Sequence, residues 1–502
     1  MLAKINSMGL LGIEGFPVEV QADASQGLPS FEVVGLPDNA VKESRERVRA
    51  AIKNCGLEFP TRRITVNLAP ADRKKEGALY DLPILLGILG ASGQLKALPQ
   101  DAIFLGEVAL DGSVRKITGV LPMALEARRR GVREIYLPRE NATEATLADG
   151  ITVYGISHVK ELLSHFSGET PLSPTEKWIP SETTCNVPDF GDVCGQENVK
   201  RAIEIAAVGG HNILLVGPPG GGKSMLAQRI PGILPPLSKE EALETTAIHS
   251  VRGLVSEENP LLSERPFRSP HHQMSAMGMT GGGRVPQPGE ISLAHNGVLF
   301  LDEFPEFAPT ALEALRQPLE DGKITITRVA GTLTYPASFM LVCAMNPCKC
   351  GWYGYSKERC ECTPRMVAQY RKRISGPLLD RIDMHVQVPM VPYEEMIRPG
   401  SAESSATIRE RIIKVRERIA PRFAGTKVTC NARMTPEQLK EHCKLEGGAN
   451  NLMKQAYDKL GLTARSYTKL LRVARTIADM AGSETIETVH LAEAIQFRPN
   501  EN

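Results

Sequence analysis

The chain of 502 residues is too long for one ordinary hydrophobic core, and we expect about two to four domains. Apolar residues make up 42% and charged residues 23%, as in globular proteins, and no stretch approaches the roughly 18 apolar residues of a membrane-spanning helix. A formal net charge of +1 excludes a globally basic surface, so any nucleic-acid contact must come from a local cluster or from several copies. The first residues lack the features of a secretory signal, and we expect a cytoplasmic protein with no membrane partner.

Residues 1–165 alternate short apolar runs with turns, which is the pattern of an α+β domain. Strands are expected at Pro17–Ala22, Arg63–Asn67 and Ala102–Gly106, and helices at Ala40–Asn54, Leu82–Ala91 and Ala124–Arg130. Residues 166–188 are rich in Ser, Thr, Pro and Glu and show no apolar period, which predicts a linker.

An α/β domain is expected over residues 189–390, where helical patterns alternate with buried-type strands. Its strand Ile213–Val216 runs into a glycine-rich loop and then a helix, an order in which backbone N–H groups converge on phosphate oxygens. We predict an ATP site in which Lys223 reaches the β- and γ-phosphates and Ser224 binds Mg²⁺. The residues expected to contact nucleotide are Gly217, Pro218, Pro219, Gly220, Gly221, Gly222, Lys223, Ser224 and Met225.

A second acidic element of this site is expected after the apolar strand Val298–Leu301. Asp302 would hold Mg²⁺ through water, and Glu303 would orient and polarise the attacking water. A solvated strand end is the alternative, because such acidic pairs are common. Between the two elements lies Met274–Gly289, rich in Met and Gly and carrying Arg284, whose irregular composition suggests a protruding loop.

Three further strands follow. Lys323–Thr327 alternates polar and apolar residues and can pair with Thr332–Tyr335 as a hairpin that carries Lys323 and Arg328. The strand Phe339–Ala344 ends near Asn346, whose amide could hold the γ-phosphate or the water; an Asn in a turn is the alternative.

Four cysteines lie close together directly after Asn346. Cys348 and Cys350, and Cys360 and Cys362, form two pairs, and residues i and i+2 of an extended segment point to the same side. Four thiolates make a tetrahedral Zn²⁺ site, so we predict a zinc knuckle over residues 348–362. The spacing within each pair is shorter than usual, and unliganded thiols or a redox disulfide are the alternatives.

Residues 391–502 are expected to form a helical domain. Arg465 begins the helical run Ala464–Ala481 and could contact phosphate from that side. Earlier in the chain Arg381 could reach the γ-phosphate of a neighbouring subunit and neutralise charge there. Most arginines are solvated surface residues, which is the alternative for both.

Several motifs make residues 189–500 resemble the AAA+ ATPases related to the magnesium-chelatase motor subunit, and the whole chain is similar to the ComM/YifB subfamily. The motifs are Asp192–Gln196, Gly209–Asn212, Arg268–His272, Pro288–His295, Leu315–Glu320, Met345–Cys348 and Ser375–Arg381. The resemblance implies homohexameric rings in which a neighbour completes each site, sensor roles for Asn346 and Arg465, a finger role for Arg381 and a helical lid at 391–502. It also implies DNA branch migration in natural transformation, with recombination or DNA-uptake proteins as possible partners.

The first domain resembles the proteolytic domain of Lon, through Phe104–Gly112, Ala127–Gly131 and Ile135–Glu140. Lon chemistry needs a Ser nucleophile and a Lys that activates it. At the corresponding places this chain has Gly77–Tyr80 and Pro122 with Met123. We therefore expect a Lon-protease-like domain without its catalytic dyad.

Three functions compete on these grounds. The first is a ring that moves on DNA, with Arg284, Lys323 and Arg328 facing the channel, as insertions of related motors do; an ordinary edge hairpin is the alternative reading of that segment. The second is a chelatase-type motor that remodels a protein partner. The third, an ATP-dependent protease, is disfavoured by the missing dyad.

Overall fold

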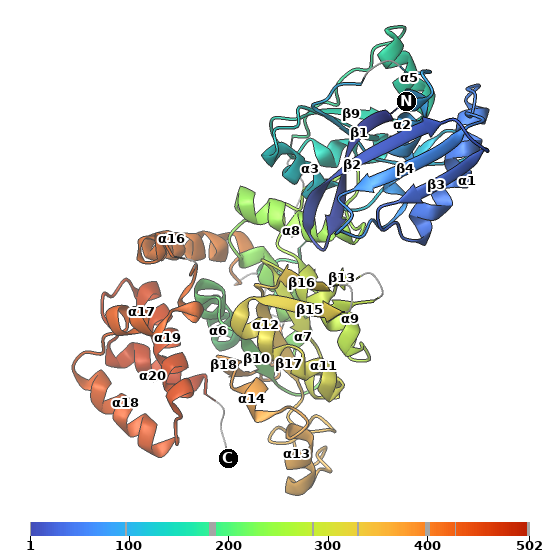
Figure 1. The fold of residues 1–502 in the computed structure, drawn as a ribbon. Coiled ribbons are helices and arrows are strands. Elements are labelled where there is room, and N and C mark those ends of the chain that lie inside the picture. Colours follow the sequence, from blue (N-terminus) through green and yellow to red (C-terminus); the bar gives the residue numbers. More distant parts are fainter. Residues whose placement is uncertain are drawn as a thin grey trace. The chain divides into compact units, whose positions relative to one another are not determined.

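The computed structural model describes residues 2–95, 98–179, 187–283, 286–328, 331–396, 402–426 and 428–498. These residues form two compact units (Figure 1). Unit 1 comprises residues 2–179 together with 239–262, and unit 2 comprises residues 187–238 together with 263–498. Within the described ranges no helix is long and apolar enough to cross a membrane.

Unit 1 is built on a four-stranded sheet in the order β1-β2-β4-β3. Alternate residues of β2 are buried, because helix α2 covers that face, and at Gly87 the helix approaches the sheet so closely that a Cβ would lie 3.1 Å from Ala22 Cβ. A second sheet, in the order β5-β8-β9, is parallel. The strands are β1 (Leu2–Leu11), β2 (Glu14–Ser25), β3 (Ser30–Val34), β4 (Arg63–Ala69), β5 (Ala102–Phe104), β6 (Glu107–Val108), β7 (Val114–Arg115), β8 (Glu134–Pro138) and β9 (Thr152–Ile156). The helices are α1 (Asn39–Asn54), η1 (Ala78–Tyr80), α2 (Asp81–Ala91), α3 (Val120–Arg129), α4 (Arg139–Ala145), α5 (Val159–Ser167) and α8 (Lys239–Val251).

Unit 2 has a five-stranded sheet in the order β11-β14-β17-β10-β18, in which every neighbouring pair is parallel. Strands β14 and β17 are buried along their whole length, as expected for the middle of a parallel sheet covered on both faces. The strands are β10 (Ile213–Val216), β11 (Phe267–Arg268), β12 (Gly281–Gly282), β13 (Gln287–Pro288), β14 (Val298–Leu301), β15 (Lys323–Arg328), β16 (Gly331–Pro336), β17 (Met340–Met345) and β18 (Met384–Gln387). The helices that precede the C-terminal group are η2 (Phe190–Asp192), α6 (Glu197–Gly209), α7 (Lys223–Ile233), α9 (Ala276–Thr280), α10 (Glu290–Leu293), η3 (Phe304–Glu306), α11 (Pro309–Glu313), α12 (Arg316–Asp321), α13 (Pro364–Arg371), α14 (Gly376–Leu379) and α15 (Tyr393–Met396).

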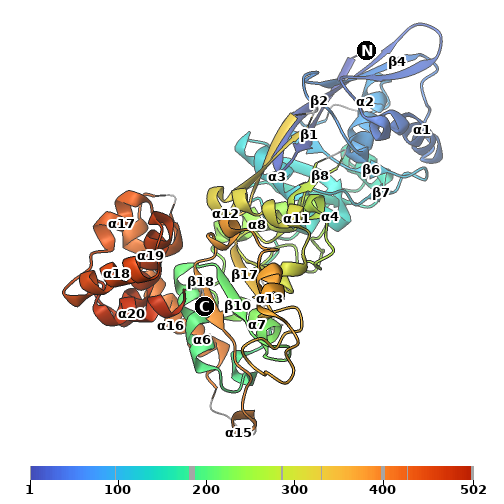
Figure 2. The ribbon, with the colours of Figure 1, turned by 90° about the horizontal axis from the view of Figure 1, so that it is seen from below.

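The C-terminal part of unit 2 is helical in the described residues. Its helices are α16 (Ser405–Phe423), η4 (Asn431–Arg433), α17 (Pro436–His442), α18 (Gly448–Lys459), α19 (Ala464–Ala481) and α20 (Thr488–Gln496). Figures 1 and 2 show α17–α20 gathered at one side of unit 2. Helix α19 begins at a capping box of Thr463 and Ser466 and ends at Gly482, and its buried face joins the same hydrophobic core as α6 and β10.

Most of the strands and helices predicted for the first domain are confirmed, with changes of a few residues at their ends. Strand β1 was not predicted. The segment Met274–Gly289 is not the irregular loop we predicted, because it contains α9 and the short strands β12 and β13. Arg284 lies outside the described residues.

The two units divide the chain differently from the predicted ranges in one respect. Residues 239–262, predicted to belong to the 189–390 domain, lie in unit 1, where α8 packs against α3. The predicted linker is also partly packed on unit 1, since the Thr175 N–H donates to Val153 O at 2.7 Å. The other limits of the ranges 1–165, 166–188, 189–390 and 391–502 stay predictions.

Candidate functional site

The glycine-rich loop leaves the carboxyl end of the central strand β10 and enters α7. Gly220 and Gly222 have left-handed φ values of +77° and +82°, which favour glycine. A Cβ at Gly217 would lie 2.3 Å from Val388 O, so the neighbouring backbone also requires glycine there. The loop therefore takes the conformation that directs backbone N–H groups and a helix N-terminus at an anion.

Lys223 is buried at the start of α7, with only 9% of its surface exposed. Its Nζ donates to Gly217 O at 2.8 Å, Pro218 O at 2.9 Å and Asn346 Oδ1 at 3.1 Å. Burial lowers the pKa of this ammonium group, although the nearby charge of Asp302 opposes the shift. A phosphate oxygen that replaced one of these neutral acceptors would give the buried cation an anionic partner.

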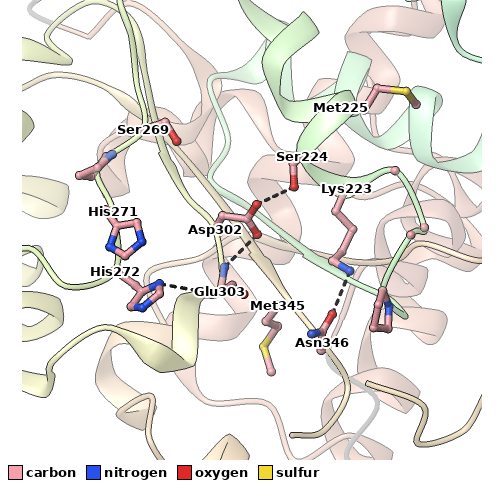
Figure 3. Close-up of a pocket in the computed structure, with 15 residues that line it drawn as sticks. Lys223, Ser224, Met225, Ser269, His271, His272, Asp302, Glu303, Met345 and Asn346 are labelled. Atoms are coloured by element: carbon pink, nitrogen blue, oxygen red, sulfur yellow. Dashed lines mark hydrogen bonds and ion pairs between the residues drawn. The ribbon is translucent and has the colours of Figure 1, made fainter. Parts of the chain in front are cut away.

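Ser224 and Asp302 are joined directly, as Figure 3 shows, since Ser224 Oγ donates to Asp302 Oδ2 at 2.5 Å. The other carboxylate oxygen of Asp302 accepts from the Glu303 N–H at 2.8 Å. A hydroxyl and a carboxylate oxygen at this separation are a donor set that suits Mg²⁺.

Glu303 has a left-handed φ of +50° and a side chain that is 58% exposed. Its Oε2 lies 3.0 Å from Nδ1 of His272, a residue the sequence analysis did not assign to the site. Only its place in the motif Arg268–His272 could have pointed to it. Figure 3 shows His272, Glu303 and Asp302 on the same side of the cavity.

These side chains surround one cavity of about 670 Å³. Its lining residues are Pro219, Gly220, Gly221, Gly222, Lys223, Ser224, Met225, Ser269, Pro270, His271, His272, Asp302, Glu303, Met345 and Asn346. Two of the predicted catalytic residues, Arg381 and Arg465, do not line it. The structure thus brings the loop, Asp302, Glu303 and Asn346 together, while the roles assigned to them stay predictions.

A second cavity, of about 660 Å³, is lined by Gln196 and by residues 389–392 that follow β18. Gln196 connects this cavity to the glycine-rich loop (the P-loop, residues 217–224), because its Nε2 donates to Gly221 O at 2.8 Å and to Pro389 O at 2.9 Å. Its Oε1 is buried and has no hydrogen-bond partner among the described atoms. Nothing in the local sequence pattern pointed to this residue beyond its place in the motif Asp192–Gln196.

Arg381 and Arg465 instead meet at Glu320. Arg381 Nη2 lies 2.8 Å from Glu320 Oε1, and Arg465 Nη2 contacts the same oxygen. The backbone before β18 is held by Asn212, whose Nδ2 donates to Arg381 O at 3.0 Å while its Oδ1 accepts from the Leu341 N–H at 2.9 Å.

The four clustered cysteines converge, with all four Sγ atoms within 4.8 Å of one another. Cys348 is buried, and its Sγ lies 3.3 Å from that of Cys350. The backbone N–H of Trp352 lowers the pKa of Cys350 to about 6, which favours a thiolate. Four sulfurs in such a group fit tetrahedral Zn²⁺. The same loop packs on the P-loop, since a Cβ at Gly351 would lie 2.5 Å from Pro219 Cδ.

The hairpin β15–β16 forms as predicted, with Lys323 paired to Pro336 and Thr327 to Thr332. Lys323 is exposed, whereas Ile324 and Ile326 are buried on the opposite face. In unit 1, Gly77–Tyr80 lie at the turn η1, and Pro122 and Met123 are buried in α3. None of these residues supplies a hydroxyl nucleophile with a lysine partner.

The parallel sheet brings four features to one cavity: a glycine-rich loop, a buried lysine, a Ser–Asp pair and a second carboxylate. Together they define a P-loop nucleoside triphosphatase. Residues 189–396 match the family "Magnesium chelatase, subunit ChlI", residues 402–498 match its C-terminal family, and residues 20–141 match "Subunit ChlI of Mg-chelatase". The chain is 44% identical to YifB of Salmonella typhimurium, a protein described as uncharacterized, and 42% identical to competence protein ComM of Haemophilus influenzae. Each comparison covers 99% of this chain and 97% of the relative.

The chain therefore belongs to the ComM/YifB subfamily of magnesium-chelatase-like AAA+ ATPases. Membership of the AAA+ family implies ATP and Mg²⁺ as ligands of the site. A shorter similarity, 33% identity over 149 residues, links the chain to Lon protease 2 of Bacillus subtilis and covers 27% of this chain and 26% of that protein.

Proposed function

We propose that this protein forms a homohexameric ring that couples ATP hydrolysis to movement on DNA, in branch migration or helicase action during recombination or natural transformation. The observation that carries the ATPase part is the single cavity onto which Lys223, Ser224, Asp302, Glu303 and Asn346 converge. The DNA part is supported by the similarity to competence protein ComM over 99% of the chain and by the exposed Lys323 at the base of a hairpin.

Each residue of the cavity has its own role in ATP hydrolysis. Lys223 exchanges its carbonyl partners for phosphate oxygens, and Ser224 and Asp302 hold Mg²⁺, which supplies positive charge to the β- and γ-phosphates. Glu303 orients the attacking water and accepts its proton, while Asn346 holds the water or the γ-phosphate. Arg381 acts on the nucleotide of a neighbouring subunit, which agrees with its absence from the lining of its own chain's cavity.

Three further features belong to this proposal. The buried Oε1 of Gln196, in the second cavity, accepts a hydrogen bond from the adenine base of the nucleotide. This bond would give the oxygen the partner that it lacks. The C-terminal helices act as the lid, and Arg465 of α19 reports the state of the nucleotide. The four cysteines hold one structural Zn²⁺ beside the P-loop.

The test is the rate of ATP hydrolysis with and without DNA, together with DNA affinity at several salt concentrations. Contacts to phosphates make binding weaken steeply with salt, and we expect a slope that corresponds to roughly 4–8 phosphates. Replacing Lys323 and Arg328 with Ala should reduce this slope and the stimulation by DNA while basal hydrolysis persists. A matched control, Lys454→Ala with Lys459→Ala, removes the same charge from exposed positions of α18.

A second candidate, a chelatase-type motor that remodels a protein partner, is supported by the three magnesium-chelatase families that match the chain. Rings that hydrolyse ATP but neither bind DNA at low salt nor respond to it would favour this candidate. An unchanged salt slope in the Lys323/Arg328 variant would instead remove only the hairpin from the DNA contact.

A further inference from the structure

One carboxylate in unit 2 binds two arginines that come from different parts of the chain. Glu320, near the end of α12, places Oε1 2.8 Å from Arg381 Nη2, and the same oxygen contacts Arg465 Nη2. Arg381 precedes β18, whereas Arg465 lies in the first turn of α19. Both guanidinium groups thus share one anionic partner, and neither residue lines the cavity of their own chain.

The backbones around the two arginines are fastened to each other independently of Glu320. Lys469, one turn beyond Arg465 in α19, is buried and donates from Nζ to Ile382 O at 2.9 Å. Asn212 holds the carbonyl of Arg381. Because the backbones are fixed in this way, loss of the Glu320 contact would remove the shared anionic partner of the two side chains without separating α19 from the segment before β18.

The two arginines differ in how tightly they are held. Arg381 is 9% exposed and also donates to Pro377 O at 2.5 Å and Arg316 O at 3.2 Å. Arg465 is 42% exposed, and Glu320 is 45% exposed, so solvent weakens their attraction. Burial raises the pKa of Glu320, but the hydrogen bonds from Arg381 and then Arg465 outweigh it and lower the pKa overall, so the carboxylate stays charged.

Glu320 is also joined to the hairpin by a very short connection. Only Asp321 and Gly322 separate it from Lys323, the first residue of β15. Gly322 ends α12 with a left-handed φ of +64° and donates from its N–H to Pro318 O at 2.9 Å. Its carbonyl accepts from the Ala337 N–H at 2.8 Å, which closes the base of the hairpin. A shift of the hairpin base must therefore move the end of α12, and Glu320 with it.

We infer that Glu320 is a positioning residue that holds Arg381 and Arg465 in ion pairs and so keeps both away from nucleotide phosphate. Bound DNA displaces the hairpin, which withdraws Glu320 and releases the two arginines. A carboxylate competes with phosphate for the same planar guanidinium donors, so the contact restrains hydrolysis until it is broken. This inference rests on the proposed function, since it takes the hairpin as the DNA contact and Arg381 as the finger. It adds the route by which DNA bound to the hairpin acts on Arg381.

The test is Glu320→Gln, which keeps the volume of the side chain and removes its charge. The half-exposed ion pair of Glu320 with Arg465 biases its equilibrium by about 1.4–5-fold, so we expect basal hydrolysis to rise by about 2–5-fold and the ratio of DNA-stimulated to basal rate to fall by a similar factor. The matched control is Glu493→Gln, which breaks the 3.0 Å ion pair with Arg201 between α20 and α6, at 30% and 40% exposure. The control should change neither rate.

Two additional variants separate restraint from a structural role. The gain caused by Glu320→Gln should shrink when Arg465→Ala is added, because one of the two arginines that Glu320 restrains is then absent. If thermal unfolding shows that Glu320→Gln does not fold, Glu320→Asp keeps the charge at a shorter reach and should give a smaller rise in basal rate. A fall in the basal rate of folded Glu320→Gln rings, or a gain that Arg465→Ala leaves unchanged, overturns the inference.

The outcome for the proposed function is read separately, from the response of the wild-type protein to DNA. If DNA does not change wild-type hydrolysis but Glu320→Gln still raises the basal rate in an Arg465-dependent way, the DNA function fails while the restraint by Glu320 holds. If DNA stimulates the wild type and Glu320→Gln equally in fold terms, with unchanged basal rates, the proposed function holds and the restraint is refuted.

Discussion

A methyl group added at Gly351 tests how closely the cysteine loop is packed against the P-loop. The Cβ of an alanine there would lie 2.5 Å from Cδ and 2.6 Å from Cγ of Pro219, and 3.8 Å from Cγ of Asn346. Carbon atoms attract each other best at about 3.5–4.0 Å, so Pro219 or the cysteine loop would have to move. We expect Gly351→Ala to weaken ATP binding although it lies outside the glycine-rich loop.

The magnitude follows from comparison with Gly354 in the same loop. Gly351 and Gly354 have similar left-handed φ values, +90° and +83°, and a Cβ at Gly354 would meet no atom within 4 Å. Both alanine variants should therefore lose about 1–2 kcal/mol of folding stability from the backbone conformation. Overpacking adds about 1–3 kcal/mol at Gly351 alone. If about half of that strain is carried by the P-loop, ATP affinity falls by about 2–10-fold.

The assay is a titration of each variant with a fluorescent ATP analogue and Mg²⁺, alongside thermal unfolding. Both variants should unfold at a lower temperature than the wild type, and only Gly351→Ala should lose affinity for the analogue. Equal affinities of the two folded variants would refute the mechanical link between the cysteine loop and the P-loop.

The remaining predictions concern the catalytic residues and the metal. Lys223→Ala should abolish hydrolysis and weaken nucleotide binding, whereas Glu303→Gln should bind ATP and trap it, because Asp302 still holds Mg²⁺ while the water loses its polarising carboxylate; normal turnover of Glu303→Gln contradicts this role. Arg381→Ala subunits should be inactive alone but regain activity when mixed with Lys223→Ala subunits, and mixed rings without any activity would show that Arg381 does not act on a neighbour. Metal analysis of chelator-washed protein should find about one zinc per chain. A variant with Ser at Cys348, Cys350, Cys360 and Cys362 should have none, and equal zinc in the two proteins would refute the site.

Much of the nucleotide site could be predicted from the sequence because its parts are local. The order of a short apolar strand, a glycine-rich loop and a helix determines where Lys223 and Ser224 lie relative to a phosphate. The carboxyl ends of parallel strands share one edge of the sheet, so Asp302 after β14 and Asn346 after β17 lie beside the loop that follows β10. The convergence of the four cysteines was also predicted, but the reason given for the first pair is wrong, because Cys348 and Cys350 meet across a turn closed by the Gly351 N–H and Cys348 O and not along an extended segment.

Other features were decided only by tertiary structure. The packing of residues 239–262 in unit 1 depends on contacts of α8 with α3, more than 100 residues earlier, and no periodicity within the segment reports them. The pairing of Glu303 with His272 and of Gln196 with Gly221 likewise joins loops that are far apart in sequence.

Glu320 depends most clearly on tertiary structure. In the sequence of its own helix, α12, it is one of several charged residues near a helix end. Its contact with Arg465 spans 145 positions, and its contact with Arg381 crosses the strand β17 and the cysteine loop. Local sequence determined which side chains are basic and where each helix begins, because those properties depend on neighbouring residues. The packing of α12, α19 and the segment before β18 determined which acidic side chain contacts which basic one, because ion pairs depend on distance in space.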